Sequence, residues 1–176
     1  MKGWPEMYNR PMHSRSMCNP YGYQCPWNHP VYSPPYQEPI PLRDYGPEPF
    51  VVNIESATLQ NNTFRTALWT GNHLQLTLMS INVGDDIGLE MHPDVDQFIR
   101  IEQGQGLVMM GDSRDNLNYR RCVGDDYAIF VPAGKWHNLI NTGYMPLKLY
   151  SIYAPPEHPH GTVHKTKKNA EEHHHR

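Results

Sequence analysis

Two segments of the sequence combine glycine-containing turns with side chains that bind metal ions. Residues 84–97 read GDDIGLEMHPDVDQ, and residues 124–141 read GDDYAIFVPAGKWHNLIN. In the first segment Glu90 and His92 lie two positions apart, so on a β-strand both side chains point to the same face. A turn follows them, and Gln97 then begins a return strand with its side chain on that face. The first segment therefore predicts a hairpin that presents three polar donors together.

The sequence around these segments predicts an all-β domain. Leu74, Leu76 and Leu78 alternate with polar residues, as in a half-buried strand, and the alternating pattern begins at residues 50–54. Turn residues separate strand-like runs at 64–69, 74–83, 87–91, 97–103, 107–110, 119–123, 127–131, 136–141 and 147–153. Short strands at this spacing favour a sandwich or barrel, with one helical turn expected at Ser56–Gln60.

The two segments resemble the paired motifs of the cupin superfamily. The second motif is matched by Gly124, Pro132, Gly134, His137 and Asn141. The first keeps Gly84, His92 and Gly104, but Glu90 replaces its first histidine and Gln97 replaces its glutamate. The resemblance covers about residues 50–155 and implies a cupin fold, the double-stranded β-helix or jelly-roll barrel. It also implies a homodimer, because cupin barrels often pair through their outer sheet.

Within the family, the run at residues 150–156 is similar to small single-domain cupins labelled mannose-6-phosphate isomerase-like. That label reflects likeness of fold more than demonstrated chemistry, so the resemblance implies no reaction.

Four donor side chains are expected to lie together at one mouth of the barrel, because the second motif places His137, on a separate hairpin, beside the three donors of the first motif. Glu90, His92 and His137 form a set of two histidines and one carboxylate, the arrangement used for non-haem iron(II) with open coordination positions. We expect these three residues to bind one divalent metal ion, with Gln97 as a fourth ligand or close neighbour. Nitrogen and oxygen donors suit Mn, Fe, Co, Ni or Zn. The alternative is a cupin without a metal, in which hydrogen bonds satisfy Glu90 and Gln97.

Two classes of function follow from this site. The first is a small metal-dependent enzyme, such as a dioxygenase or a sugar isomerase or epimerase, in which the metal polarises a substrate oxygen. No histidine or carboxylate outside the ligand set stands out as a base, so the catalytic residues stay unknown. The second is a non-enzymatic binding or structural module. A small polar molecule or sugar is the expected partner, and Arg65 and Arg100 are placed on solvated faces, with anion binding as the alternative.

Composition divides the chain into an arm (residues 1–48), the barrel (49–156) and a His-rich tail (157–176). Eleven of the 17 prolines and six of the 11 tyrosines lie in the first 50 residues. Proline interrupts helices and central strands, so we expect a disordered or extended arm, with an interaction arm as the alternative. The composition of the arm is similar to Tyr/Pro-rich segments of bacterial spore-coat proteins. In the tail, His158, His160 and His164 are expected on the surface or folded over the barrel mouth.

Charge, hydropathy and cysteine content argue against several other classes of protein. The net charge is −3, so the chain lacks the basic surplus of a protein whose main partner is nucleic acid. No run of 18 apolar residues is present, so no membrane association is expected. Three cysteines do not suggest a disulfide framework. We therefore expect a cytoplasmic protein, with the spore coat as the alternative location.

Overall fold

The computed structural model describes residues 38–174. The prediction of a disordered or extended arm falls largely on residues 1–37, which lie outside the described residues. A compact unit begins at Pro39 and contains the whole barrel.

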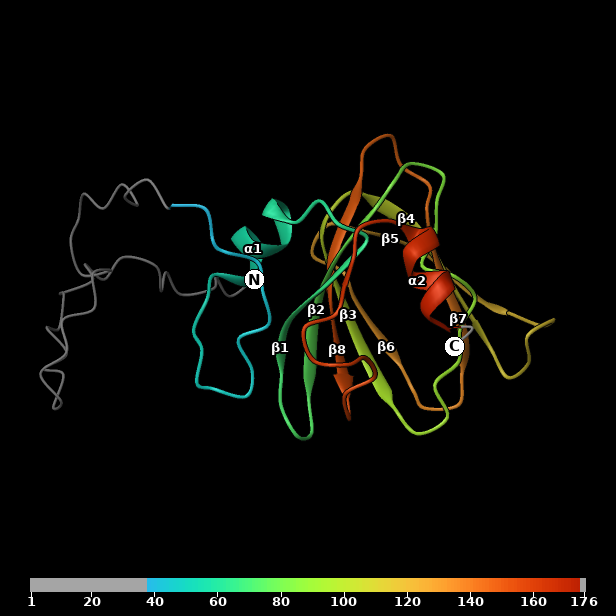
Figure 1. Cartoon of the computed structure of the whole chain (residues 1–176). Helices are drawn as coiled ribbons and strands as arrows, with labels where there is room; N and C mark the ends of the chain where they lie inside the picture. Colours follow the sequence, from blue (N-terminus) through green and yellow to red (C-terminus); the bar gives the residue numbers. More distant parts are fainter. Residues whose placement is uncertain (1–37, 175–176) are drawn as a thin grey trace, which may run out of the picture. The chain divides into compact units, whose positions relative to one another are not determined.

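Two antiparallel sheets form the barrel (Figure 1). The elements are α1 (Ile54–Gln60), β1 (Arg65–Thr70), β2 (Gln75–Ile81), β3 (Asp96–Gln103), β4 (Gln105–Gly111), β5 (Tyr119–Gly124), β6 (Ala128–Val131), β7 (Trp136–Asn141), β8 (Leu147–Ala154), β9 (Val163–His164) and α2 (Lys167–His174). The larger sheet has the order β6-β3-β8-β2-β1-β9, and the smaller has the order β5-β4-β7. The expected all-β jelly-roll architecture is confirmed.

The core lies between the inner faces of the two sheets. Ile99, Ile101 and Leu149 of the larger sheet belong to the same buried cluster as Val108 and Leu139 of the smaller sheet. Residues paired across antiparallel strands share a face, so the inner face of the larger sheet can be followed from strand to strand. One inner row runs Ile101–Leu149–Met79–Arg65, and the next runs Ile99–Ser151–Thr77–Ala67. Polar side chains thus lie among apolar ones on the inner face of the barrel.

The run at residues 87–91 is not the continuous strand that alternation predicts. This part of the chain makes only isolated bridges, at Asp86 and at Glu90. Between these two residues Gly88 has a φ of +95°, a conformation that favours glycine. Ile87 packs in the core and Glu90 also faces the interior, although side chains three positions apart on a regular strand face opposite sides. The break at Gly88 allows both to face inward, which the alternation alone did not reveal.

Two further elements differ from the sequence prediction. Residues 50–54 do not begin a strand; Asn53 instead caps α1, its side chain accepting a hydrogen bond from the Ser56 backbone N–H at 3.0 Å. The tail adds a short strand, β9, which pairs with β1. The tail also ends in α2, where the sequence predicts a short helix at Lys167–Glu172.

The boundary between arm and barrel lies earlier than residue 48. Leu42 and Tyr45 pack with Ala57 of α1 against Leu68 and Leu78 on the outer face of the larger sheet. The Tyr45 backbone N–H also donates to the Leu68 carbonyl at 2.9 Å. Prolines in this segment prevent strand formation but not apolar burial, and composition alone therefore assigned residues 39–48 to the arm. In the described part of the chain, neither helix has the length and apolar character needed to cross a membrane.

Candidate metal centre

Backbone hydrogen bonds place the two motif segments side by side. The Glu90 N–H donates to the His137 carbonyl at 3.1 Å, and the His137 N–H donates to the Glu90 carbonyl at 2.9 Å. The Gly134 N–H donates to the His92 carbonyl at 2.7 Å. The main chain of the first motif is therefore held against β7 and the turn before it, and this fixes where the side chains of Glu90, His92 and His137 begin.

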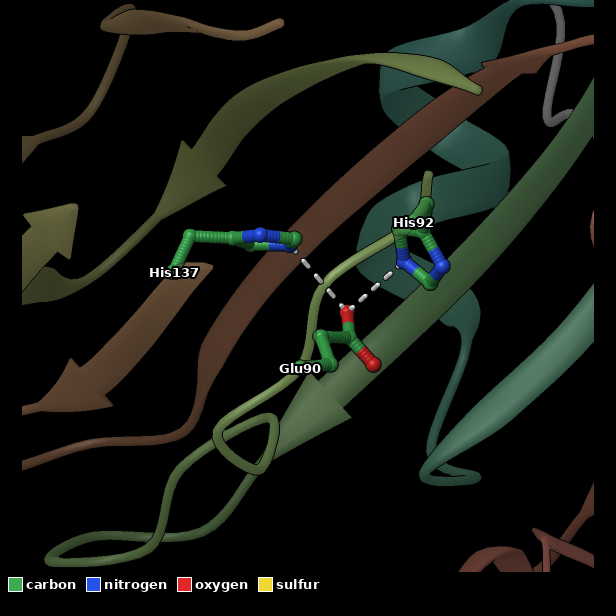
Figure 2. A group of neighbouring side chains, drawn as sticks. All are labelled: Glu90, His92 and His137. Atoms are coloured by element: carbon green, nitrogen blue, oxygen red, sulfur yellow. Dashed lines mark ion pairs between the residues drawn. The ribbon is translucent and has the colours of Figure 1, made fainter. Parts of the chain in front are cut away.

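These three side chains point toward one another inside the barrel (Figure 2). Glu90 Oε1 lies 3.4 Å from His137 Nε2 and 3.5 Å from His92 Nε2. Both distances are too long for strong charge-assisted hydrogen bonds. They match the separation of two ligand atoms that each lie about 2.1 Å from a shared ion at a near-tetrahedral angle, which is about 3.4 Å.

The contact that each imidazole makes through Nδ1 determines whether its Nε2 atom, which faces Glu90, carries a hydrogen or a lone pair. His137 Nδ1 lies 3.0 Å from the Lys135 carbonyl, and His92 Nδ1 lies 3.1 Å from a Glu157 carboxylate oxygen. Since a carbonyl or carboxylate only accepts, each neutral ring carries its hydrogen on Nδ1 and turns the lone pair of Nε2 toward Glu90. Both Nε2 atoms and Glu90 Oε1 are buried without a hydrogen-bond partner. Three acceptors that converge in this way fit a cation.

Electrostatics keep the carboxylate of this group ionised. Burial by itself would raise the pKa of Glu90, but His137, His92 and the charge of Arg65 hold that pKa well below its usual range. Burial likewise opposes a charge on His92, yet Glu90 and Glu157 outweigh it and raise the His92 pKa. The Glu90 carboxylate is therefore ionised at neutral pH, which is the form that binds a cation.

Gln97 lies on the inner face of the larger sheet, as its position in the sequence predicts. Its side chain is buried, and its Nε2 donates to Ser151 Oγ at 2.9 Å. Its carbonyl oxygen Oε1 is buried without a hydrogen-bond partner. Because the amide nitrogen is held by Ser151, the oxygen is the atom available to a ligand. The role of Gln97 as a fourth ligand stays a prediction.

A cavity of about 520 Å³ opens beside the centre. Glu90 and His92 line it together with Phe64 and Arg65, and α2 contributes Lys167. A small molecule in this cavity would therefore contact two of the three proposed metal ligands. A larger cavity of about 640 Å³ lies along β5 and β6, and none of the three proposed metal ligands lines it.

The contact of Glu157 with His92 was not predicted from the sequence, and the expected position of Arg65 is wrong. Glu157 follows two prolines in the tail and carries no motif, so no local signal links it to His92. Arg65 was expected on a solvated face but is 1% exposed, because its strand position faces the barrel interior. Arg100 lies on the opposite face of the sheet and pairs with Glu102 and Asp126.

The histidines of the tail do not join the ligand group. His158 and His164 are buried, so a surface position is wrong for both, whereas His160 is exposed near Asp44. The ring of Tyr153 lies between His92 and His158, with ring centroids 5.8 Å and 5.1 Å away. His158 therefore contacts Tyr153, which in turn contacts the ligand residue His92.

The barrel and its His–Glu centre define the protein as a cupin, and comparison with known proteins agrees. A cupin-domain family model matches residues 77–153, and the chain belongs to the cupin superfamily. The uncharacterised protein YrkC of Bacillus subtilis is 72% identical over 129 residues, which cover 73% of this chain and 69% of YrkC. The uncharacterised protein L612 of Acanthamoeba polyphaga mimivirus is 41% identical over 115 residues, covering 65% of this chain and 70% of L612.

A solved structure is also similar to the barrel. The crystal structure of BH2720 from Bacillus halodurans has 66% sequence identity to this chain and a TM-score of 0.73. The match covers 74% of this chain and 98% of BH2720. The fold described above is therefore shared with an experimentally determined relative.

Proposed function

We propose that the protein is a metal-dependent cupin that acts on a small polar molecule. Glu90, His92 and His137 bind one divalent ion, and Gln97 serves as a fourth ligand or close neighbour. The observation that carries the proposal is the convergence of two Nε2 lone pairs and a carboxylate oxygen, all buried and without hydrogen-bond partners. Mn, Fe, Co, Ni and Zn all accept such a donor set.

Dioxygenation is the reaction that this donor set favours. A divalent ion held by two histidines and one carboxylate would leave open positions for substrate and oxygen, as in non-haem iron(II) enzymes. Sugar isomerisation or epimerisation, the chemistry suggested by the isomerase-like subtype, needs a base within reach of the substrate. Glu90 and Glu157 are both engaged with histidines, so Glu171 of α2 is the remaining carboxylate in the cavity lining that could serve as a base.

The surrounding residues hold the substrate and limit water access. Phe64 and Ile87 give the cavity apolar walls, and α2 covers part of it through Lys167 and Ala170. Lys167 is held in place by ion pairs with Asp85 and Asp86. A substrate that enters this enclosure exchanges water for fixed protein groups, which strengthens its electrostatic contacts.

Elemental analysis of protein purified without nickel resin and without residues 173–176 tests the metal site. We expect about one divalent ion per chain, and none in the His92→Ala variant. His160→Ala is the matched control, because His160 is an exposed histidine outside the ligand group. Equal metal content in the wild type and His92→Ala would overturn the proposal.

A non-enzymatic binding module associated with the spore coat is the second candidate. It is supported by the tyrosine- and proline-rich composition of the first 50 residues, which a small enzyme does not need. Cell fractionation separates the two: an enzyme of the cytoplasm stays soluble, whereas a coat module is recovered with the coat only when residues 1–37 are present.

A further inference from the structure

Arg65 is the charged end of an apolar row inside the barrel. It is the first residue of β1 and pairs with Met79 of β2 on one side and His164 of β9 on the other. Met79, Leu149 and Ile101 continue the row across β2, β8 and β3. Side chains in such a row face the same side, so the guanidinium extends into the interior near the metal centre.

This guanidinium makes no ion pair within 4.0 Å in the described part of the chain, and the charge of Glu90 acts on it only from a longer distance. Arg65 is 1% exposed, and its Nε and Nη1 atoms are buried without a hydrogen-bond partner. No carboxylate among residues 38–174 lies within 4.0 Å of its nitrogens, and its recorded ring contact is with Phe64 at 5.6 Å. An arginine stays charged in proteins, and a buried charge without a partner is costly. An anion from outside the chain would relieve that cost.

The cavity gives such an anion a place to bind. Arg65, Glu90 and His92 line the same space of about 520 Å³. With a divalent ion bound, the two charges of the ion and those of Arg65 and Arg114 exceed the negative charges of Glu90, Glu157 and Glu171, which line the same cavity. The loaded site thus has a positive excess beside buried groups, where charges interact more strongly than in water. Lys167 in the same cavity is already paired with Asp85 and Asp86.

We propose that Arg65 is the anion-binding residue of this cavity and that its ligand is a small carboxylate. The carboxylate accepts a hydrogen bond from one of the unpartnered nitrogens, Nε or Nη1, and another oxygen of the same molecule points toward Glu90, His92 and His137. A planar guanidinium matches the two oxygens of a carboxylate. The second contact rests on the proposed function, whereas the contact with Arg65 does not.

Titration calorimetry with lactate and lactamide tests the proposal. The two probes have similar shape, and lactate alone is charged. We expect the wild type to bind lactate at least tenfold more tightly than lactamide, and Arg65→Gln to bind lactate about 10- to 100-fold more weakly than the wild type. Arg65→Lys, which keeps the charge without the planar fork, should lie between them. Arg100→Gln is the matched control, an arginine on the outer face of the same sheet, and should bind as the wild type does.

Circular dichroism and metal analysis accompany each titration. If Arg65→Gln does not fold, Arg65→Lys carries the test, because weakened lactate binding with unchanged metal content supports the proposal. Full lactate affinity in a folded Arg65 variant would overturn it, and so would binding of inorganic phosphate in preference to lactate.

Chelator-treated protein separates the two proposals. Arg65-dependent lactate binding without any metal supports the anion site even if the metal centre fails its own test. Loaded protein should bind lactate more tightly than chelated protein.

Discussion

At the scale of single residues, the centre depends on which nitrogen of each histidine carries the hydrogen. Lys135 and Glu157 accept from the Nδ1 atoms of His137 and His92 and so direct both Nε2 lone pairs inward. The histidines were evident from the sequence because the motif spacing marks them. Their orientation was not, since a main-chain carbonyl and a tail carboxylate supply it.

Substitutions at Gln97 measure what the fourth donor adds. Gln97→Ala should weaken metal binding without abolishing it, because a neutral amide oxygen contributes less than the carboxylate of Glu90. Gln97→Glu should tighten binding, since it adds a charged ligand. Competition with a metal-binding dye gives the dissociation constants. Full occupancy in Glu90→Gln together with loss in Gln97→Ala would show that Glu90 is not the main anionic ligand.

Glu157 is a positioning residue, and its replacement should affect the metal more than the fold. Glu157→Gln removes the charged acceptor of the His92 Nδ1 hydrogen, so we expect metal affinity to fall about 10- to 100-fold. The metal-free protein should unfold at nearly the wild-type temperature. Glu171→Gln is the control, because Glu171 lines the same cavity from α2 but makes no recorded contact with His92. Equal affinities in the two variants would contradict the role given to Glu157.

At the scale of elements, the Asp44 carboxylate adds hydrogen bonds to the apolar packing that holds the segment before α1 against the sheet. Asp44 accepts from Thr70 Oγ1 at 2.6 Å and from the Gly161 and Gly46 N–H groups at 2.9 Å and 3.0 Å. Burial opposes its charge, but these hydrogen bonds outweigh burial and lower the Asp44 pKa. Asp44 thus connects residues 39–48, β1 and the tail.

The lowered pKa of Asp44 predicts how stability depends on pH. A carboxyl whose folded pKa lies below its unfolded value stabilises the fold above the unfolded pKa, and the effect is lost as the pH falls through the folded pKa. Asp44→Asn should therefore cost about 1–3 kcal/mol near neutral pH. Urea unfolding at several pH values should show that the difference from the wild type shrinks below about pH 4. A difference that stays constant to low pH would contradict this assignment.

At the scale of the whole molecule, two truncations locate the true start of the domain. A chain that begins at residue 38 should unfold at nearly the same temperature as one that begins at residue 1. A chain that begins at residue 49 uncovers Leu68 and Leu78 and loses Tyr45, so it should be less stable by about 2–4 kcal/mol. Thermal unfolding of the three chains measures this. Equal stability for the starts at 38 and 49 would mean that residues 39–48 contribute nothing to the domain.

The homodimer stays a prediction, and the outer face of the larger sheet offers a place for it. The ring of Phe98 lies 5.2 Å from that of Phe130 and 6.1 Å from that of Tyr150. Phe130 is 71% exposed, and an exposed aromatic cluster is typical of contact surfaces. Sedimentation should give a mass of about 41 kDa, twice the 20.4 kDa of one chain, and Phe130→Glu should halve it. A wild-type mass near 20 kDa at micromolar concentration would exclude the dimer.

The sequence by itself determined most of the strands, the class of fold and the identity of the three residues of the centre. Alternation and turn residues are local signals, and the spacing within the two motifs marks Glu90, His92 and His137. The tertiary structure decided the break at Gly88, the burial of Arg65 and the contact of Glu157 with His92. Those features depend on which strands become neighbours and on where the tail returns. Contacts between residues so far apart in the chain leave no periodic trace in a single sequence.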